Sequence, residues 1–426
     1  MESAFCVKLE EPLKPDPKSE NRIEAEAIAS QTLRSNIVSV PLKSIDPLQP
    51  VDPLNQKKYL LAGKNQYHTL WARDLSMSVA GALLIGETQT ARDSLGIFFS
   101  LQRSDGLLPR VIDNRNITSR VLWGLIGYPP LYTEPLRGWF TTENHVISID
   151  SNLILPWAAS HYIDQTKDEK FAAHWFTAME RALAFIEQNF LVEGLVGNQP
   201  PFSDWKDSIQ RTGRVSFTNA LYILALRGAA KWAKFLGLSA KHTHFLTRAE
   251  EVNALFRKYF WIPERKILRN FEGNDLLTAD ANLFAVVHQL IPVNEATEVM
   301  IELRKSPIWL PVPGAPTWPS YPSKLKSTLV RAIFLHGYHD RLYWIWISAL
   351  AARAEKAIGN PIEYERIMNY LASRIVSDKG IYEVYDASKN EMELRPHVGP
   401  IYRADRSFTW SSACYLEAEL ASHGKF

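Results

Sequence analysis

Apolar residues recur three and four positions apart through most of this chain, and this spacing constrains the fold more than any other feature of the sequence. Residues at such intervals lie on one face of an α-helix. The pattern predicts about twelve helices, at residues 23–35, 74–86, 89–102, 150–164, 168–189, 215–236, 241–259, 279–289, 294–305, 340–357, 361–375 and 407–422. Strand patterns are scarce apart from short pieces such as Ile37 to Val40, so we expect an all-α protein.

The length and composition of the chain favour one large domain. Its 426 residues, 46% of them hydrophobic, can fill a substantial core, and closed helical rings of this size are often single cooperative units. We therefore expect one domain over residues 21–426. Residues 1–20 carry Pro12, Pro15 and Pro17 among charges, which predicts a flexible N-terminal tail.

Charge and motif content exclude several classes of function. Lysine plus arginine number 48 and aspartate plus glutamate 46, so no general field favours nucleic acid, and no basic run stands out. No apolar stretch is suited to a signal sequence or long enough to span a membrane, so we expect a cytoplasmic protein. Two cysteines, Cys6 and Cys414, predict neither a disulfide framework nor a zinc site. Phosphate-binding glycine loops and helical metal motifs are also missing from the sequence.

Two long connections between predicted helices are rich in aromatic residues. Residues 104–149 contain Trp123, Tyr128, Tyr132 and Trp139, and residues 307–322 alternate proline with Trp309, Trp318 and Tyr321. Long loops in compact domains tend to be functional, and aromatic faces can hold a sugar ring by stacking. The alternative is that these aromatics only attach the loops to the helices, and the sequence leaves both interpretations open.

Polar clusters fall at the starts of alternate predicted helices. They are Trp71 to Asp74, Asp150 to Asn152, Asp204 to Ser208, Asp280 to Asn282, Tyr338 to Arg341 and Arg406 to Ser411. Any single cluster is explained by helix capping, which favours aspartate, serine and threonine. The regular alternation indicates more. If every second helix belongs to an inner ring, all six clusters open onto the same end of a barrel, where the N-terminal ends of the helix dipoles also converge.

Several of these segments together resemble one family. Trp71-Ala72-Arg73-Asp74-Leu75-Ser76 resembles a segment of glucoamylases, Gly106-Leu107-Leu108-Pro109-Arg110 resembles glycogen-debranching enzymes, and Asp150-Ser151-Asn152-Leu153 resembles alkaline/neutral invertases. The chain is similar to the (α/α)6-barrel glycosidases over residues 60–420, with the segments in the same order. The resemblance implies a ring of six helical hairpins, a carbohydrate substrate, and no metal or organic cofactor.

The resemblance also implies the catalytic acid. Glycoside hydrolysis needs one carboxylic acid to protonate the leaving oxygen and one carboxylate to activate water or to attack. The segment Asp204-Trp205-Lys206-Asp207-Ser208 is similar to the family's acid-bearing segment and aligns Asp207 with the general acid. Asp204 is the rival candidate, with capping or sugar binding as its other roles.

The general base is implied by a later segment. Ile381-Tyr382-Glu383-Val384-Tyr385-Asp386, followed by Ser407-Phe408-Thr409-Trp410-Ser411, resembles the family's base segment and places Glu383 as the base. Its aromatic and apolar neighbours argue against an ordinary exposed glutamate. Glu391 and Glu393, in a more polar stretch, look solvated.

Further residues are expected to bind the sugar. The resemblance implies that Arg73 and Asp74 hold hydroxyls of the terminal sugar, because charged planar groups bind vicinal hydroxyls in fixed geometry. The other expected binding residues are Trp71, Trp205, Trp344 and Trp410 for stacking, and Asp150, Asn152, Asp204, Tyr338 and His339 for polar contacts. Relatives invert the anomeric configuration, so we expect a carboxyl separation of about 6.5–9.5 Å.

The sequence-based hypothesis is an inverting, exo-acting hydrolase of α-glucosidic bonds. A sucrose-cleaving invertase is the first alternative. An epimerase on the same barrel is the second, and it would use histidine bases such as His339 and His397. A sugar-binding protein without catalysis is the third.

Overall fold

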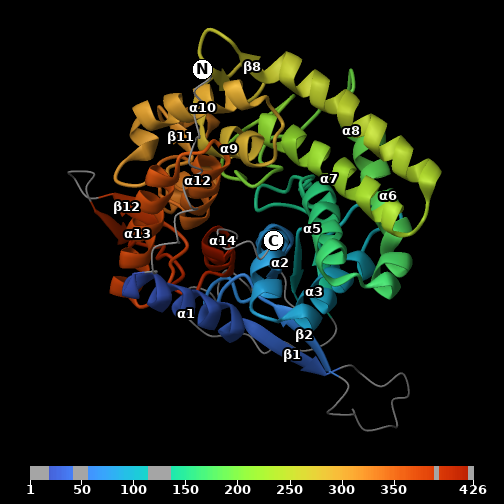
Figure 1. Ribbon diagram of the computed structural model, residues 1–426, viewed down its shortest axis with the longest axis horizontal. Helices are drawn as coiled ribbons and strands as arrows, with labels where there is room; N and C mark the ends of the chain where they lie inside the picture. The colour runs from blue at the N-terminus through green and yellow to red at the C-terminus, as the bar shows by residue number, and fades with distance from the viewer. Residues whose placement is uncertain (1–18, 42–55, 114–135, 388–392, 421–426) are drawn as a thin grey trace, which may run out of the picture.

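The computed structural model describes residues 19–41, 56–113, 136–387 and 393–420, and it forms a closed ring of paired helices (Figure 1). Six helices form the inner ring, namely α2 (Ala72–Leu84), α5 (Ser151–Thr166), α7 (Ser216–Phe235), α9 (Ala279–Val287), α12 (Ile345–Ala357) and α14 (Thr409–Leu420). Each packs on the next in this order, and α14 returns to α2. The expected (α/α)6 architecture is confirmed.

Six further helices surround the inner ring. They are α1 (Glu20–Ser35), α3 (Thr88–Ser100), α6 (Glu169–Phe190), α8 (Ser239–Phe260), α10 (Val293–Lys305) and α13 (Pro361–Asp378). Five of them follow and pack on the inner helix that precedes them, whereas α1 packs on α13 and α14. The beginning of the described chain therefore completes the sixth hairpin with its end, as Figure 1 shows at the dark blue and red helices.

Sequence periodicity separates the two layers. Inner helices are apolar nearly all round; in α7, every residue from Ser216 to Leu226 is buried. Outer helices bury one face and expose the other, and two of them have side-chain N-caps. In α6 the side chain of Asp168 accepts a hydrogen bond from the backbone N–H of Phe171, and in α13 Asn360 caps a helix that begins with Pro361.

All twelve predicted helices are present, with ends that differ by a few residues. The largest difference is at α12, which was expected from residue 340 and begins at Ile345, because residues 337–342 form turns. Periodicity missed the short α11 (Thr328–Ala332) and the 3-10 turns η1 (Pro307–Trp309) and η2 (Ser323–Leu325). Such short elements leave no repeated apolar pattern.

Short strands join the helices, mostly as small hairpins. The pairs are β1 (Ile37–Pro41) with β2 (Gln56–Leu60), β6 (Leu191–Val192) with β7 (Leu195–Val196), β8 (Trp261–Ile262) with β9 (Ile267–Leu268), β10 (Leu277–Thr278) with β11 (Thr317–Trp318), and β12 (Tyr385–Ala387) with β13 (Leu394–Pro396). A three-stranded sheet has the order β3 (Leu70–Trp71), β4 (Val111–Asp113), β5 (Arg137–Trp139). All of these pairs are antiparallel.

Most of the predicted tail, together with Cys6, Trp123, Tyr128, Tyr132 and Glu391, lies outside the described residues. No helix in the described ranges is both long and apolar enough to cross a membrane. Within the same ranges, histidine, cysteine and acidic side chains form no group of three or more that could hold a metal ion.

Close approach of two inner helices depends on a glycine. A Cβ atom added at Gly81 in α2 would lie 2.6 Å from the Cα and Cβ atoms of Ala413 in α14. We expect Gly81→Ala to lower the free energy of unfolding by about 1–3 kcal/mol, because the clash is with backbone. Gly96→Ala in α3 is the matched control, since its Cβ would make an ordinary contact 3.6 Å from Trp175. Urea unfolding measures both variants, and equal midpoints would contradict close packing at Gly81.

Candidate active site

A cavity of about 350 Å³ opens where inner helices α2, α12 and α14 begin, and we call it the active cavity. Ten of the thirteen residues that the sequence singled out line it. They are Trp71, Arg73, Asp74, Trp205, Asp207, Tyr338, His339, Trp344, Glu383 and Trp410. Asp207 and Glu383, 176 positions apart in the sequence, therefore reach one cavity.

The other three predicted residues, Asp150, Asn152 and Asp204, are buried and do not line the active cavity, so the structure gives no support to the expectation that they bind the sugar directly. Asp150 is fully buried, and its Oδ2 atom forms an ion pair with Nε of Arg73 at a distance of 2.8 Å. The side-chain amide of Asn152 binds the backbone. Its oxygen accepts a hydrogen bond from the N–H of Leu108, and its nitrogen donates one to the carbonyl of Gly106. These residues hold the walls of the site in place.

Asp207 is bound by two guanidinium groups. Its Oδ2 atom lies 2.9 Å from Nη1 of Arg73 and 2.8 Å from Nη2 of Arg110. Burial alone would raise the pKa of Asp207, but the two arginines outweigh it and lower that pKa to about 2. The Asp207 carboxyl is therefore ionised at neutral pH in this structure.

Glu383 is surrounded by tyrosine hydroxyls. Tyr338 and Tyr402 both donate hydrogen bonds to its carboxyl oxygens, and the hydroxyl of Tyr67 lies 2.7 Å from that of Tyr338 and 3.0 Å from that of Tyr402. The Glu383 side chain is fully buried. Burial raises the pKa of Glu383 to about 8, although the tyrosine hydroxyls act in the opposite direction.

These two charge states are the reverse of those that the sequence-based roles require. A general acid must hold a proton at neutral pH, yet Asp207 is ionised. A general base must be ionised, yet burial raises the pKa of Glu383 to about 8. The physical causes differ: Arg73 and Arg110 form ion pairs with Asp207 and lower its pKa, whereas burial raises the pKa of Glu383, which forms no ion pair with either arginine among the described residues.

Two other titratable groups of the active cavity are largely desolvated. Burial raises the pKa of Asp74 to about 7, against the opposing charge of Arg73. Burial also lowers the pKa of His339 to about 3, so its ring is neutral at pH 7. The Nδ1 atom of that ring lies 2.8 Å from the hydroxyl of Ser208, and the ring stacks on Trp344 at 5.5 Å.

Tryptophans form the floor of the active cavity. The ring of Trp205 lies 4.9 Å from Trp346, and Trp346 stacks on Trp410 at 4.7 Å. Trp205, Trp344 and Trp410 are each at most 5% exposed, so little of each ring is accessible from the cavity. Trp71 is partly exposed on one wall, where the guanidinium of Arg110 lies 4.5 Å from its ring centre.

Apolar side chains form much of the remaining wall. Leu329 and Val330 of α11, with Ile333, Leu335 and Ile401, line the cavity together with the charged groups. The active cavity therefore offers both fixed charges and an apolar face to a bound molecule.

A buried ion network lies beneath the segment that carries Asp207. Asp280 at the start of α9 pairs with Nζ of Lys206 at 3.3 Å and with Nη1 of Arg211 at 3.1 Å, and it accepts a 2.7 Å hydrogen bond from the indole of Trp205. Arg211 also pairs with Asp204 at 2.5 Å. Because all of these groups are buried, the network fixes the backbone on both sides of Asp207.

Sequence reasoning missed several residues of the active cavity. Arg110 is the last residue of the Gly106 to Arg110 motif, and it forms ion pairs with Glu143 and with Asp207. A lone arginine after a strong motif is the signal that could have found it. Tyr67 and Tyr402 carry no comparable signal in the sequence.

The pKa shifts of Glu383 and Asp207 have opposite signs, so we expect the two carboxyls to change the stability of the fold with pH in opposite directions. Because the pKa of Glu383 is raised, the unfolded chain releases this proton near pH 4.5 while the folded protein keeps it to about pH 8. Wild type therefore loses stability relative to Glu383→Gln between those pH values, by at most about 1.4 kcal/mol per pH unit. Asp207, with its pKa lowered to about 2, stabilises the fold above pH 3.8 and loses this contribution below it.

Urea unfolding of wild type, Glu383→Gln and Asp207→Asn at pH 5, 6, 7 and 8 measures this difference. We expect the stability of Glu383→Gln relative to wild type to rise across the series, and that of Asp207→Asn to stay constant. A constant difference for Glu383→Gln would contradict a buried, protonated Glu383.

Comparison with known proteins finds the same architecture in glycosidases. Residues 134–307 match the family model described as the bacterial alpha-L-rhamnosidase six-hairpin glycosidase domain. This stretch contains Asp207 and ends before Glu383. A search of curated proteins finds no match to the chain.

Solved structures with the same fold include a Klebsiella oxytoca rhamnosidase with rhamnose bound. It is 12% identical with a TM-score of 0.66, over 97% of this chain and 65% of the rhamnosidase. A GH78 family rhamnosidase of a Bacillus species is 13% identical with a TM-score of 0.62, over 95% of this chain and 35% of that protein. This chain therefore spans less than two thirds of the length of either rhamnosidase.

A third match is closer in length. The GH63 mannosylglycerate hydrolase of Thermus thermophilus, in complex with glucose, is 12% identical with a TM-score of 0.63, over 92% of this chain and 99% of the hydrolase. The chain has the six-hairpin glycosidase fold and contains, over residues 134–307, a stretch homologous to a glycoside hydrolase domain.

Proposed function

We propose that this protein is an exo-acting glycosidase that uses Asp207 and Glu383 as its two catalytic carboxyl groups. The observation that carries the proposal is that these two side chains line one cavity of about 350 Å³. This volume lies in the range of about 300–1,000 Å³ that small-molecule sites occupy. Two carboxyls facing one enclosed sugar are the machinery that glycoside hydrolysis requires.

The charges in the active cavity favour one division of labour. Glu383 holds a proton and donates it to the leaving oxygen as the bond from that oxygen to the anomeric carbon breaks. Asp207 is ionised and takes a proton from the water whose oxygen bonds to the anomeric carbon. Attack on the opposite face inverts the configuration. Arg73 and Arg110 keep Asp207 oriented, and the position of Asp74 in the lining of the same cavity supports a role for it in binding sugar hydroxyls.

An α-L-rhamnoside is the substrate that we place first. The match over residues 134–307 is to a rhamnosidase domain, and the wall of Leu329, Val330 and Ile333 suits the methyl group of a 6-deoxy sugar. An α-glucoside is second. It is supported by the similarity of the Trp71 to Ser76 segment to glucoamylases and by the glucose bound to the Thermus thermophilus hydrolase.

The epimerase alternative needs His339 and His397 in one site, and the structure places them in different cavities. His339 lines the active cavity, whereas His397 lines a different cavity and bonds to Asp386 there. A neutral, buried His339 without a second histidine does not favour proton exchange at a sugar carbon.

A panel of substrates tests the proposal. The p-nitrophenyl α-L-rhamnoside, α-D-glucoside and α-D-mannoside, with sucrose and maltose, would each be incubated with the protein, and proton NMR would follow the first anomer released. We expect turnover of the rhamnoside or the glucoside with inversion. Turnover of sucrose alone would support the invertase alternative. No turnover of any compound at high enzyme concentration, or release of the retained anomer, would contradict the proposed reaction.

A further inference from the structure

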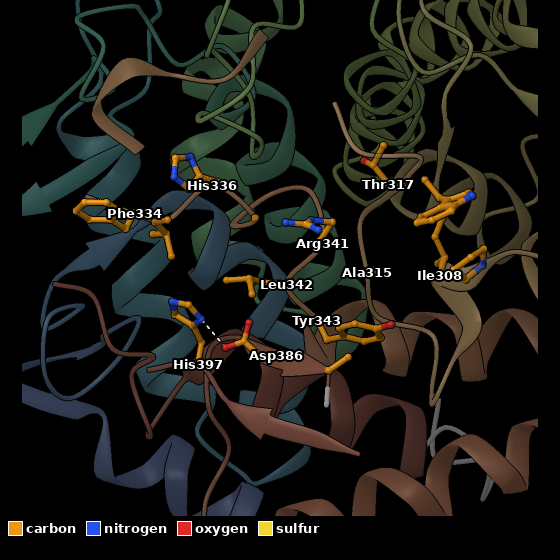
Figure 2. A pocket seen from close by; sticks show the side chains of 15 residues that line it. Ile308, Ala315, Thr317, Phe334, His336, Arg341, Leu342, Tyr343, Asp386 and His397 are labelled. Carbon is orange, nitrogen blue, oxygen red and sulfur yellow. Dashed lines mark hydrogen bonds and ion pairs between the residues drawn. The ribbon is translucent and has the colours of Figure 1, made fainter. Parts of the chain in front are cut away.

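A second hollow, of about 470 Å³, lies beside the active cavity, and one stretch of chain separates the two. Leu335 lines both spaces. From the same stretch, Val330 and Tyr338 line the active cavity, whereas His336 and Arg341 line the second hollow, where Figure 2 labels them. A molecule that extends out of the active cavity along this stretch would enter the second hollow.

An exposed tryptophan stands in the second hollow. Trp318 belongs to β11, which pairs with β10, and its side chain is 43% exposed. Every other tryptophan in the described parts of the chain is buried or half-buried. A flat aromatic face that is accessible from a hollow suits a sugar ring. Trp318 and Pro307 also line a third hollow, so the surface depression continues beyond the indole.

Hydrogen-bonding groups accompany the indole. Nδ1 of His397 lies 2.7 Å from Oδ2 of Asp386, shown by the dashed line in Figure 2, so both side chains are held in fixed orientations. Arg341 is exposed, and no ion-pair partner occurs for its guanidinium among the residues that the structure describes. Sugar hydroxyls both donate and accept hydrogen bonds, and this set offers both kinds of partner.

We propose that the second hollow is a saccharide-binding subsite that holds sugar units beyond the bond cut in the active cavity, with Trp318 as its stacking platform and Arg341 as a hydrogen-bond donor. The natural substrate is then an oligosaccharide or polysaccharide rather than a small glycoside. The inference rests on the proposed function, because the active cavity must hold the bond that is cut if the second hollow is to hold the sugar units beyond it. The volume of the second hollow lies within the range of about 300–1,000 Å³ for ligand sites.

Calorimetric titration tests the subsite without requiring turnover. In an Asp207→Asn background, which is expected to slow hydrolysis by at least about a hundredfold, the probes are maltotetraose, a linear α-1,3-linked rhamnose tetrasaccharide, glucose and rhamnose. We expect one tetrasaccharide to bind more tightly than its monosaccharide. Adding Trp318→Ala should raise the Kd of that tetrasaccharide about tenfold and leave the Kd of the monosaccharide unchanged. Arg341→Ala should act in the same direction.

Phe235→Ala is the matched control, because Phe235 is an exposed aromatic residue that lines none of the three hollows. It should change neither Kd. The proposal is overturned if Trp318→Ala leaves the Kd of the tetrasaccharide unchanged, or if neither tetrasaccharide binds more tightly than its monosaccharide. Turnover of a p-nitrophenyl glycoside together with either result would reject the subsite alone. Binding that depends on Trp318 in a protein that cleaves no glycoside would reject the proposed hydrolysis instead.

Discussion

Glu383→Gln and Asp207→Asn should each lower kcat/KM by about a hundredfold to ten-thousandfold, with the fold unchanged. Each substitution keeps the shape of the side chain and removes its ability to exchange a proton. Both side chains line the active cavity, and Glu383 is fully buried among tyrosines, so a solvent molecule cannot easily replace it. Initial rates on the best substrate of the panel measure the effect.

The control for this experiment is Glu393→Gln. Glu393 lies on the surface with 53% of its side chain exposed, and its substitution should leave the rate unchanged. If all three variants kept full activity, the two carboxyls of the active cavity would have no catalytic role. A sugar-binding protein without catalysis would then be the better account.

Rescue experiments assign the two roles. The charges in the active cavity predict that Glu383→Gln recovers rate with a leaving group that needs no protonation, such as dinitrophenol, and that azide accelerates Asp207→Asn by replacing activated water. The opposite pattern, with the dinitrophenyl glycoside rescuing Asp207→Asn, would restore the roles implied by the family resemblance.

Asp280→Ala is expected to lower the free energy of unfolding by about 3–5 kcal/mol, the largest effect on stability that we predict. The substitution leaves Lys206 and Arg211 buried without this carboxylate, and the indole N–H of Trp205 loses its acceptor. Burial raises the cost of an unpaired charge, and Lys206 already has its pKa lowered to about 8 by its surroundings. Urea unfolding at pH 7 measures the loss.

Asp164→Ala provides the comparison at the surface. Asp164 pairs with Lys167 at 3.0 Å, with 48% and 63% of the two side chains exposed, and such pairs contribute about 0–1 kcal/mol. Equal destabilisation by Asp280→Ala and Asp164→Ala would mean that the buried network contributes no more than an exposed ion pair.

Periodicity and polar spacing predicted the ring from local information. Each inner helix begins near a polar cluster, as α2 does with Arg73 and Asp74, and this alternation indicated the shared end where the active cavity opens. Long amphipathic or apolar helices repeat their signal over many turns, which is why their existence was predictable. Small elements such as α11 and the two-residue strands contain too few residues to carry a pattern.

Contacts between side chains that are distant in the sequence could not be predicted from the sequence alone. Asn152 was assigned to sugar binding from a short motif, but its amide bonds to the backbone of residues 106–108 across the helix hairpin. The proton on Glu383 depends on burial, and the negative charge on Asp207 depends on Arg73 and Arg110, which approach from other parts of the chain. A pattern of residue types gives position along the chain, whereas a pKa depends on neighbours in space.

The central claim is that Asp207 and Glu383 act on one sugar ring from two sides. The most direct test is a crystal structure of the Asp207→Asn variant soaked with the sugar that the active enzyme releases. We predict that the ring lies in the active cavity with its anomeric carbon between the side chain at position 207 and the Glu383 carboxyl, separated from each other by about 6.5–9.5 Å. A sugar bound elsewhere, or bound with its anomeric carbon out of reach of either side chain, would contradict the claim.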